Sequence, residues 1–203
     1  MGALQKGPRN RRAGVIKAIT ALENEIGESA LVDFLHSFAC PLNPEVEEFL
    51  KSKALQSARL SASQTYLLID DKSYQLQGYY TLVLKTYSVS GGELTSANRR
   101  LISRFSMADA RGDFHASVFL IAQIGKNDAI AEGQRVSGRD LIGLALDTFR
   151  EVKQRVGGKL VMVERRKDHE KLLAFYRDNG FQSWTSRIDE CEHVEYDQMF
   201  AVL

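Results

Sequence analysis

Hydrophobic residues recur at intervals of three and four positions in several parts of the chain, which is the spacing of one helix face. Within the first of these parts, Gly27 separates two short repeats. Asn43 followed by Pro44 suits the start of a later helix. Gly157-Gly158 and Asn179-Gly180 suit the ends of two others. The pattern predicts helices over residues 15–38, 45–60, 95–106, 140–156 and 169–179.

Between these segments the hydrophobic period changes to two, or the apolar run becomes continuous. The pattern predicts strands over residues 65–69, 74–87, 114–124, 159–163, 181–187 and 196–203. The first two read as an antiparallel hairpin, and the run over 114–124 predicts a strand buried on both faces. This order of helices and strands predicts a mixed α/β (α+β) fold.

Composition narrows the class of protein. The chain has 203 residues, 44% of them apolar, and a net charge of +1. We expect one globular domain over 14–203, preceded by a flexible basic tail over 1–13. The charge balance argues against bulk nucleic-acid binding, and no apolar run is long enough for a membrane span. Cys40 and Cys191 have no metal-ligand spacing, so we expect no metal and a cytoplasmic location.

A polar turn before the helix at 140–156 is the main candidate for chemistry. It contains Arg135, Ser137, Gly138, Arg139 and Asp140. Glycine lets the backbone approach a ligand, and free amides at a helix start attract a diphosphate. The same residues also fit a simpler interpretation, because serine followed three positions later by an acid is a capping box. The sequence leaves both interpretations open.

Two strings resemble the GNAT superfamily of acetyl-CoA-dependent N-acetyltransferases. Arg135-x-x-Gly138-x-Asp140 is similar to that family's Gln/Arg-x-x-Gly-x-Gly/Ala signature at the first two anchors and departs from it at the third. The string AFYRDNGF over 174–181 is a close match. Residues 38–85 look like the front half of the same fold, in the branch that contains toxin-type acetyltransferases. The resemblance covers about residues 30–203 and implies one central, mostly antiparallel, splayed sheet flanked by helices.

The resemblance also implies roles. Acetyl-CoA would be the co-substrate and Tyr176 the general acid to the departing thiolate. The residues alone favour a core tyrosine that follows Leu172 and Leu173 on one helix face. The acetyl-CoA-binding residues implied are Gln123, Gly125, Arg135, Ser137, Gly138, Arg139, Asp140 and Phe175.

The acceptor would be a primary amine. The strand over 118–124 carries no carboxylate to act as a base, and Glu164 is a possible substitute. A site without a base favours an α-amine, such as that of an aminoacyl-tRNA. An antitoxin and a second copy of the chain are further expected partners. Basic clusters at 99–104, 150–155 and 165–167 fit RNA contacts or solvated surfaces. Because Asp140 would repel a diphosphate, the alternative is a GNAT-fold binding module with little or no activity.

Overall fold

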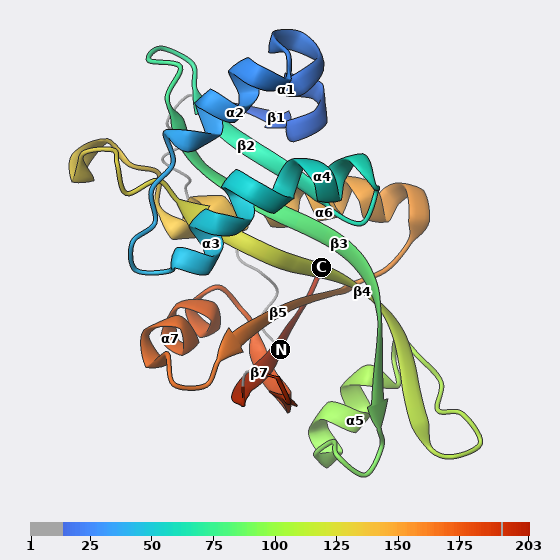
Figure 1. Cartoon of the computed structure of the whole chain (residues 1–203). Coiled ribbons are helices and arrows are strands. Elements are labelled where there is room, and N and C mark those ends of the chain that lie inside the picture. Colours follow the sequence, from blue (N-terminus) through green and yellow to red (C-terminus); the bar gives the residue numbers. More distant parts are fainter. Residues whose placement is uncertain (1–13, 192) are drawn as a thin grey trace. The chain divides into compact units, whose positions relative to one another are not determined.

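The computed structural model describes residues 14–191 and 193–203, so the predicted tail over 1–13 lies outside the described residues. The strands form a seven-stranded sheet in the order β1-β2-β3-β4-β5-β7-β6, with helices around it (Figure 1). Strand β4 pairs parallel with β5, whereas β1 with β2, β2 with β3, β5 with β7 and β6 with β7 pair antiparallel. The mixed, mostly antiparallel sheet predicted from the sequence is confirmed.

The elements have the following bounds. The strands are β1 Gly14–Ala18, β2 Gln64–Asp70, β3 Leu76–Ser90, β4 Asp113–Lys126, β5 Leu160–Arg166, β6 Gln182–Asp189 and β7 Val194–Val202. The α-helices are α1 Ile19–Ile26, α2 Glu28–His36, α3 Pro44–Glu48, α4 Ala54–Arg59, α5 Ser96–Ile102, α6 Gly138–Val156 and α7 Glu170–Asp178. A π-helical turn spans Phe49–Lys53, and a 3-10 turn spans Glu132–Gln134.

The described residues divide into two compact units. The N-terminal unit comprises residues 14–83 and 121–147, and the C-terminal unit comprises 84–120, 148–191 and 193–203. Strands β3 and β4 and helix α6 each contribute to both units. The predictions of a single domain and of a splay between strands concern the two units together, and they stay predictions.

In the N-terminal unit, β1, β2 and β3 pair antiparallel in chain order. Helices α1 to α4 pack on one face of these strands, where Ile19, Leu35, Leu50 and Tyr79 belong to a common buried cluster. One prediction is wrong here, because residues 14–18 form strand β1 rather than the start of a helix. Ile16 pairs with Leu68 of β2, and this long-range pairing overrides the local helical spacing.

The segment predicted as one helix over 45–60 consists of three pieces. Pro44 begins α3, as expected, but the Asn43 side chain makes no capping hydrogen bond. A π-helical turn then interrupts the α-helical ladder before α4 starts at Ala54. Such a turn shifts the register of the buried face, and Leu50 and Ala54 are both fully buried.

In the C-terminal unit, the parallel pairing of β4 with β5 covers three residue pairs, from Val118–Leu160 to Leu120–Met162. Strand β7 lies between β5 and β6. Trp184 of β6 stacks on Phe200 of β7, and helix α5 packs through Ile102 against the same cluster. The prediction that 114–124 is buried on both faces is wrong for its first half, where buried and exposed residues alternate.

Candidate functional site

The turn before α6 is capped by Ser137. The Ser137 hydroxyl accepts a hydrogen bond from the Asp140 amide at 3.1 Å and donates one to the Asp140 carboxylate at 2.6 Å. Among the described residues, Asp140 forms no ion pair with Arg135 or Arg139. The Ser137 side chain thus makes the cap that the sequence spacing predicts, although the reciprocal bond of a capping box, from the Ser137 amide to the Asp140 carboxylate, is not formed within the described part of the chain. The Asp140 carboxylate is held by Ser137 in the first turn of the helix.

Apolar contacts hold the same turn from below. Val136 and Leu141 lie immediately before the cap residue and four positions after it, and both pack with Leu68 of β2 in one buried cluster. This arrangement is a hydrophobic staple, which fixes the angle at which the chain enters a helix. The backbone of the turn is thus preset by its own neighbours.

The two arginines of the turn differ. The Arg135 guanidinium bonds to the Asp128 carboxylate and to the Ile130 carbonyl, at 2.6 Å for the latter. The loop itself uses these two donors of Arg135, and the implied contact of Arg135 with acetyl-CoA stays a prediction. Arg139 is exposed and makes no ion pair within residues 14–191 and 193–203.

The start of α6 fits an anion. The backbone amides of Ser137, Gly138 and Arg139 have no backbone acceptor among the described residues, and the helix dipole adds positive charge there. The Arg139 side chain adds a further donor. The Asp140 carboxylate opposes these groups, but its hydrogen bond to Ser137 directs it to the cap. We conclude that the donor set suits a diphosphate and that Asp140 weakens the fit.

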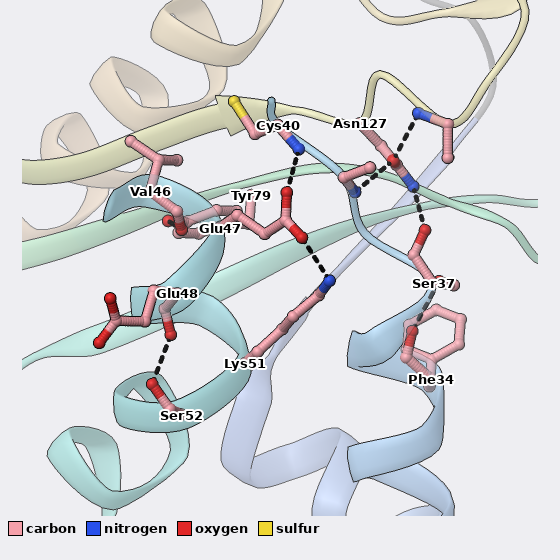
Figure 2. A network of polar contacts seen from close by, with 12 residues as sticks. Phe34, Ser37, Cys40, Val46, Glu47, Glu48, Lys51, Ser52, Tyr79 and Asn127 are labelled. Atoms are coloured by element: carbon pink, nitrogen blue, oxygen red, sulfur yellow. Dashed lines mark hydrogen bonds and ion pairs between the residues drawn. The ribbon is translucent and has the colours of Figure 1, made fainter. Parts of the chain in front are cut away.

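A buried asparagine that sequence reasoning missed supports the loop leading to this turn (Figure 2). Asn127 is 2% exposed and directly follows β4. Its amide nitrogen donates to the Ser37 and Leu76 carbonyls at 3.2 and 2.8 Å. Its amide oxygen accepts from the Ala39 and Ala129 amides at 2.9 and 3.0 Å. All four hydrogen bonds that an asparagine side chain can readily make are formed.

A second polar group in Figure 2 fixes the segment between α2 and α3. The Glu47 carboxylate accepts from the Cys40 amide at 2.7 Å and from the Lys51 ammonium at 2.6 Å. These bonds, led by the one from Cys40, hold the pKa of Glu47 below its usual range. Burial raises the pKa of the Cys40 thiol, which is therefore an inert core group rather than a nucleophile.

Gly125 and Gln123 occupy the end of β4. Gln123 is half-buried, and Gly125 is buried. A Cβ at Gly125 would lie 2.7 Å from the Val46 side chain and 3.0 Å from Phe38, so only glycine fits. Close packing against the helices explains this glycine, and the expected contact of these two residues with acetyl-CoA stays a prediction.

Tyr176 lies in α7 of the C-terminal unit, 6% exposed. Its ring contacts Phe175 and Phe181, with centroids 5.4 and 5.8 Å away. The hydroxyl forms no hydrogen bond within the described residues. Burial raises the pKa of Tyr176 to about 12. The tyrosine is thus both a core residue and an uncommitted donor.

Glu164 does not fit the role of a general base. Arg187 donates to both of its carboxylate oxygens, at 2.9 and 3.0 Å, and Gln198 donates to one at 2.8 Å. Burial alone would raise the pKa of Glu164, but these hydrogen bonds and the charge of Arg187 outweigh it, and the pKa is lowered. A carboxylate held in this way is a weak proton acceptor.

The basic cluster at 165–167 is engaged in contacts within the chain, and its contact with RNA stays a prediction. Arg165 is buried, Arg166 pairs with Asp168, and Lys167 pairs with Glu195. Next to it, a pocket of about 460 Å³ opens in the C-terminal unit, and no residue predicted for the site lines it. Its lining residues are Glu93, Lys167, Ser183, Trp184, Thr185, Ser186 and Asp197.

The described part of the chain holds no group of three or more histidine, cysteine, aspartate or glutamate residues arranged to bind a metal ion. Over the same residues, no helix combines the length and apolar character needed to cross a membrane.

Comparisons with known proteins identify the fold. No family model matches the chain, and none of the curated proteins matches it. Among solved structures, a tyrosine-to-phenylalanine variant of KacT is 19% identical, with a TM-score of 0.61 over 91% of this chain and 94% of that one. The complex of AtaT with acetyl-methionyl-tRNAfMet is 18% identical, with a TM-score of 0.58 over 91% and 94%.

A third match is a tyrosine-to-phenylalanine variant of the toxin AtaT bound to acetyl-CoA and to the C-terminus of the antitoxin AtaR. It is 18% identical, with a TM-score of 0.53 over 81% of this chain and 84% of that one. At these identities the likeness concerns the fold. The chain has the fold of the GNAT acetyltransferases, as its sequence resemblance implies.

Proposed function

We propose that this chain transfers an acetyl group from acetyl-CoA to a primary amine. The likeness of fold carries the proposal. Over 91% and 81% of the chain, it matches structures that hold acetyl-methionyl-tRNA and acetyl-CoA. These are a product and the donor of acetyl transfer to an aminoacyl-tRNA. In the reaction, the amine nitrogen bonds to the thioester carbonyl carbon, the carbon–sulfur bond breaks, and the thiolate takes up a proton.

The start of α6 is the proposed diphosphate site. The resemblance implies that the diphosphate accepts hydrogen bonds from the backbone amides of Arg135, Ser137, Gly138, Arg139 and Asp140. Two of these amides are already used, because Arg135 donates to the Glu132 carbonyl and Asp140 donates to the Ser137 hydroxyl. The amides of Ser137, Gly138 and Arg139 remain, together with the Arg139 guanidinium. Gln123 and Gly125 at the end of β4, and Phe175 on α7, are proposed to contact other parts of acetyl-CoA.

Tyr176 is the proposed donor to the departing thiolate. Its pKa of about 12 lies well above the thiol value of about 8.5, so the hydroxyl is a weak acid toward sulfur. It therefore stabilises the developing charge chiefly by a hydrogen bond, while the proton lost by the amine balances the reaction. The unused hydroxyl of Tyr176 supports this role.

The proposed acceptor is the α-amine of an aminoacyl-tRNA. Since Glu164 is tied to Arg187 and Gln198, the acceptor must reach the site largely neutral. An α-amine with a pKa of about 8 meets this need near neutral pH, whereas a lysine amine of about 10.4 does not. The matched complex of AtaT with an acetylated aminoacyl-tRNA supports the same acceptor.

The test is transfer of radioactive acetyl groups from acetyl-CoA to purified aminoacyl-tRNA. Label is expected on aminoacyl-tRNA with a free α-amine, and not on uncharged tRNA or on tRNA whose aminoacyl group is already N-formylated. Label on spermidine or lysine peptides alone would contradict the acceptor but keep the transferase. Absence of label on every amine tested would contradict the transferase.

A binding module without turnover is the second candidate, and the fixed carboxylate of Asp140 favours it. Because that carboxylate repels a diphosphate, this candidate predicts no thermal shift on addition of millimolar acetyl-CoA and no transfer to any amine. The two candidates are distinguished by combining a binding titration with the label assay on the same protein.

Two protein partners complete the proposal. The AtaT variant is bound to its antitoxin's C-terminus, which supports an antitoxin partner for this chain as well. A homodimer is a further proposal. Light scattering of the purified protein would give its mass in solution, and a mass of 22.8 kDa at all concentrations would contradict the dimer.

A further inference from the structure

Arg165 is a buried cation in an unusual set of contacts. It lies on β5 and is 5% exposed. One terminal nitrogen is 3.1 Å from the Asp197 carboxylate of β7. Asp197 is itself fixed by the Ser183 hydroxyl, which donates to it at 2.7 Å. The guanidinium is therefore anchored to the sheet from one side.

The other terminal nitrogen of Arg165 points to the turn that joins β5 to α7. It donates to the Arg166, Lys167 and His169 carbonyls at 3.0, 3.1 and 3.4 Å. His169 is the residue from which α7 begins, and its carbonyl also accepts from the Leu172 and Leu173 amides at 3.0 and 3.3 Å. Arg165 thus links the sheet to the first turn of α7.

Helix α7 carries Tyr176 within its nine residues. Its first turn makes no side-chain capping bond, because His169 supplies none. A helix this short has little stability of its own, so its direction depends on what holds its ends. The Arg165 contacts hold the start, and the ring contacts of Tyr176 with Phe175 and Phe181 hold the end.

We infer that Arg165 is a positioning residue that sets where α7 presents the Tyr176 hydroxyl. The expected effect on kcat rests on the proposed acetyl transfer. The expected effect on the stability of α7 does not depend on it. A lysine at this position would keep the charge beside Asp197, but a single ammonium cannot reproduce a planar fork directed at both a carboxylate and several carbonyls.

The test compares Arg165→Lys with the matched control Arg187→Lys. Arg187 lies on β6 and binds the Glu164 carboxylate through two nitrogens, and within the described part of the chain it makes no hydrogen bond or ion pair with residues 166–169. Amide exchange of α7 is expected to accelerate at least about tenfold in Arg165→Lys and to change little in Arg187→Lys. Equal exchange in the two variants would overturn the inference.

Kinetics supply the second readout. In Arg165→Lys, kcat is expected to fall at least about tenfold, because small displacements of a reacting group are costly. The KM for acetyl-CoA should change less than kcat, because Phe175 is the one proposed acetyl-CoA contact that lies on α7 and the proposed diphosphate residues lie in the N-terminal unit. In a Tyr176→Phe background the same substitution should cost almost nothing further. An equal loss in both backgrounds would overturn the role of Arg165 in positioning Tyr176.

If Arg165→Lys does not fold, a second variant tests the same inference. The double substitution Arg165→Met with Asp197→Leu removes both charges together and leaves no unpaired buried ion. It should show the same faster exchange of α7. Wild-type protein that acetylates no amine would overturn the proposed function, and the exchange rates would then decide alone whether Arg165 holds α7.

Discussion

The Asn127 side chain in the N-terminal unit and the side chains of Arg165 and Tyr176 in the C-terminal unit differ in how fully their polar atoms are hydrogen-bonded. Every hydrogen-bonding position of the Asn127 amide is satisfied by backbone groups. Near α7, the Arg165 Nε atom is buried without a partner among the described residues, and the Tyr176 hydroxyl also makes no bond there. A donor without a hydrogen-bond partner inside a protein lowers its stability, so such donors indicate residues that serve a function other than stability.

The two regions therefore contribute to the proposed reaction in different ways. The Asn127 network, the Ser137 cap and the staple of Val136 with Leu141 give the proposed diphosphate site a rigid backbone. The α7 region supplies the proposed reacting group. Substitutions in the first region should therefore change stability and binding, and substitutions in the second should change turnover.

The largest expected effect is on stability. Asn127→Ala leaves four backbone groups without their partner, among them the buried Leu76 carbonyl, and we expect the free energy of unfolding to fall by about 3 kcal/mol. Urea denaturation measures the change. Asn43→Ala is the matched control, since the Asn43 side chain makes no capping bond, and it should cost less than about 1 kcal/mol. Similar losses in both variants would contradict the special role of Asn127.

The next effect is on turnover. Tyr176→Phe removes only the hydroxyl, and kcat is expected to fall about 100-fold with an unchanged KM for acetyl-CoA. Because burial raises the pKa of Tyr176 to about 12, the hydroxyl stays protonated throughout the neutral range. Steady-state kinetics between neutral and mildly alkaline pH test this, and a variant as active as wild type would remove Tyr176 from the chemistry.

A smaller effect is expected at the cap of α6. Asp140→Asn keeps an acceptor for Ser137 but removes the charge that opposes the diphosphate, so acetyl-CoA should bind about threefold more tightly. Loss of the favourable charge at the helix start should lower stability by about 0.5 kcal/mol. Calorimetric titration measures the affinity. Glu132→Gln, an equal change of charge on the exposed 3-10 turn, should leave it unaltered.

The smallest effect on activity is expected at Glu164. Glu164→Gln should change kcat less than about twofold, because a carboxylate tied to Arg187 is not the base. Its lowered pKa instead predicts a stabilising contribution that is present at neutral pH. That contribution is lost as the pH falls below about 4.3 towards the lowered value. A kinetic pKa that disappears in this variant would show that Glu164 does act as the base.

Much of the fold was predictable from local patterns. The antiparallel hairpin of β2 and β3, the long helix α6 and its end at Gly157 follow from hydrophobic period and turn chemistry. Strand β1 did not, because the spacing of Ile16 and Ile19 fits a helix until β2 is paired beside it. The π-helical turn at 49–53 has no local signal in the sequence either.

The site was predictable only where a motif is local. The spacing of Ser137 and Asp140 before α6 was visible in the sequence, whereas the string around Tyr176 was informative only through its resemblance to the GNAT family. Asn127 was not, since a lone asparagine in a polar loop looks like an ordinary turn residue. The ion pairs of Arg135 with Asp128 and of Arg165 with Asp197 were not predictable either, because they form only in the folded chain.

The central claim is that the start of α6 binds the diphosphate of acetyl-CoA, and calorimetric titration of acetyl-CoA tests it most directly. Wild-type protein should bind in a saturable way, Gly138→Glu should bind at least about tenfold more weakly, and Gly133→Glu should bind like wild type. Gly133 is a suitable control because a side chain there would meet nothing within 4 Å. Absence of binding to the wild type, or equal affinities for all three proteins, would contradict the claim.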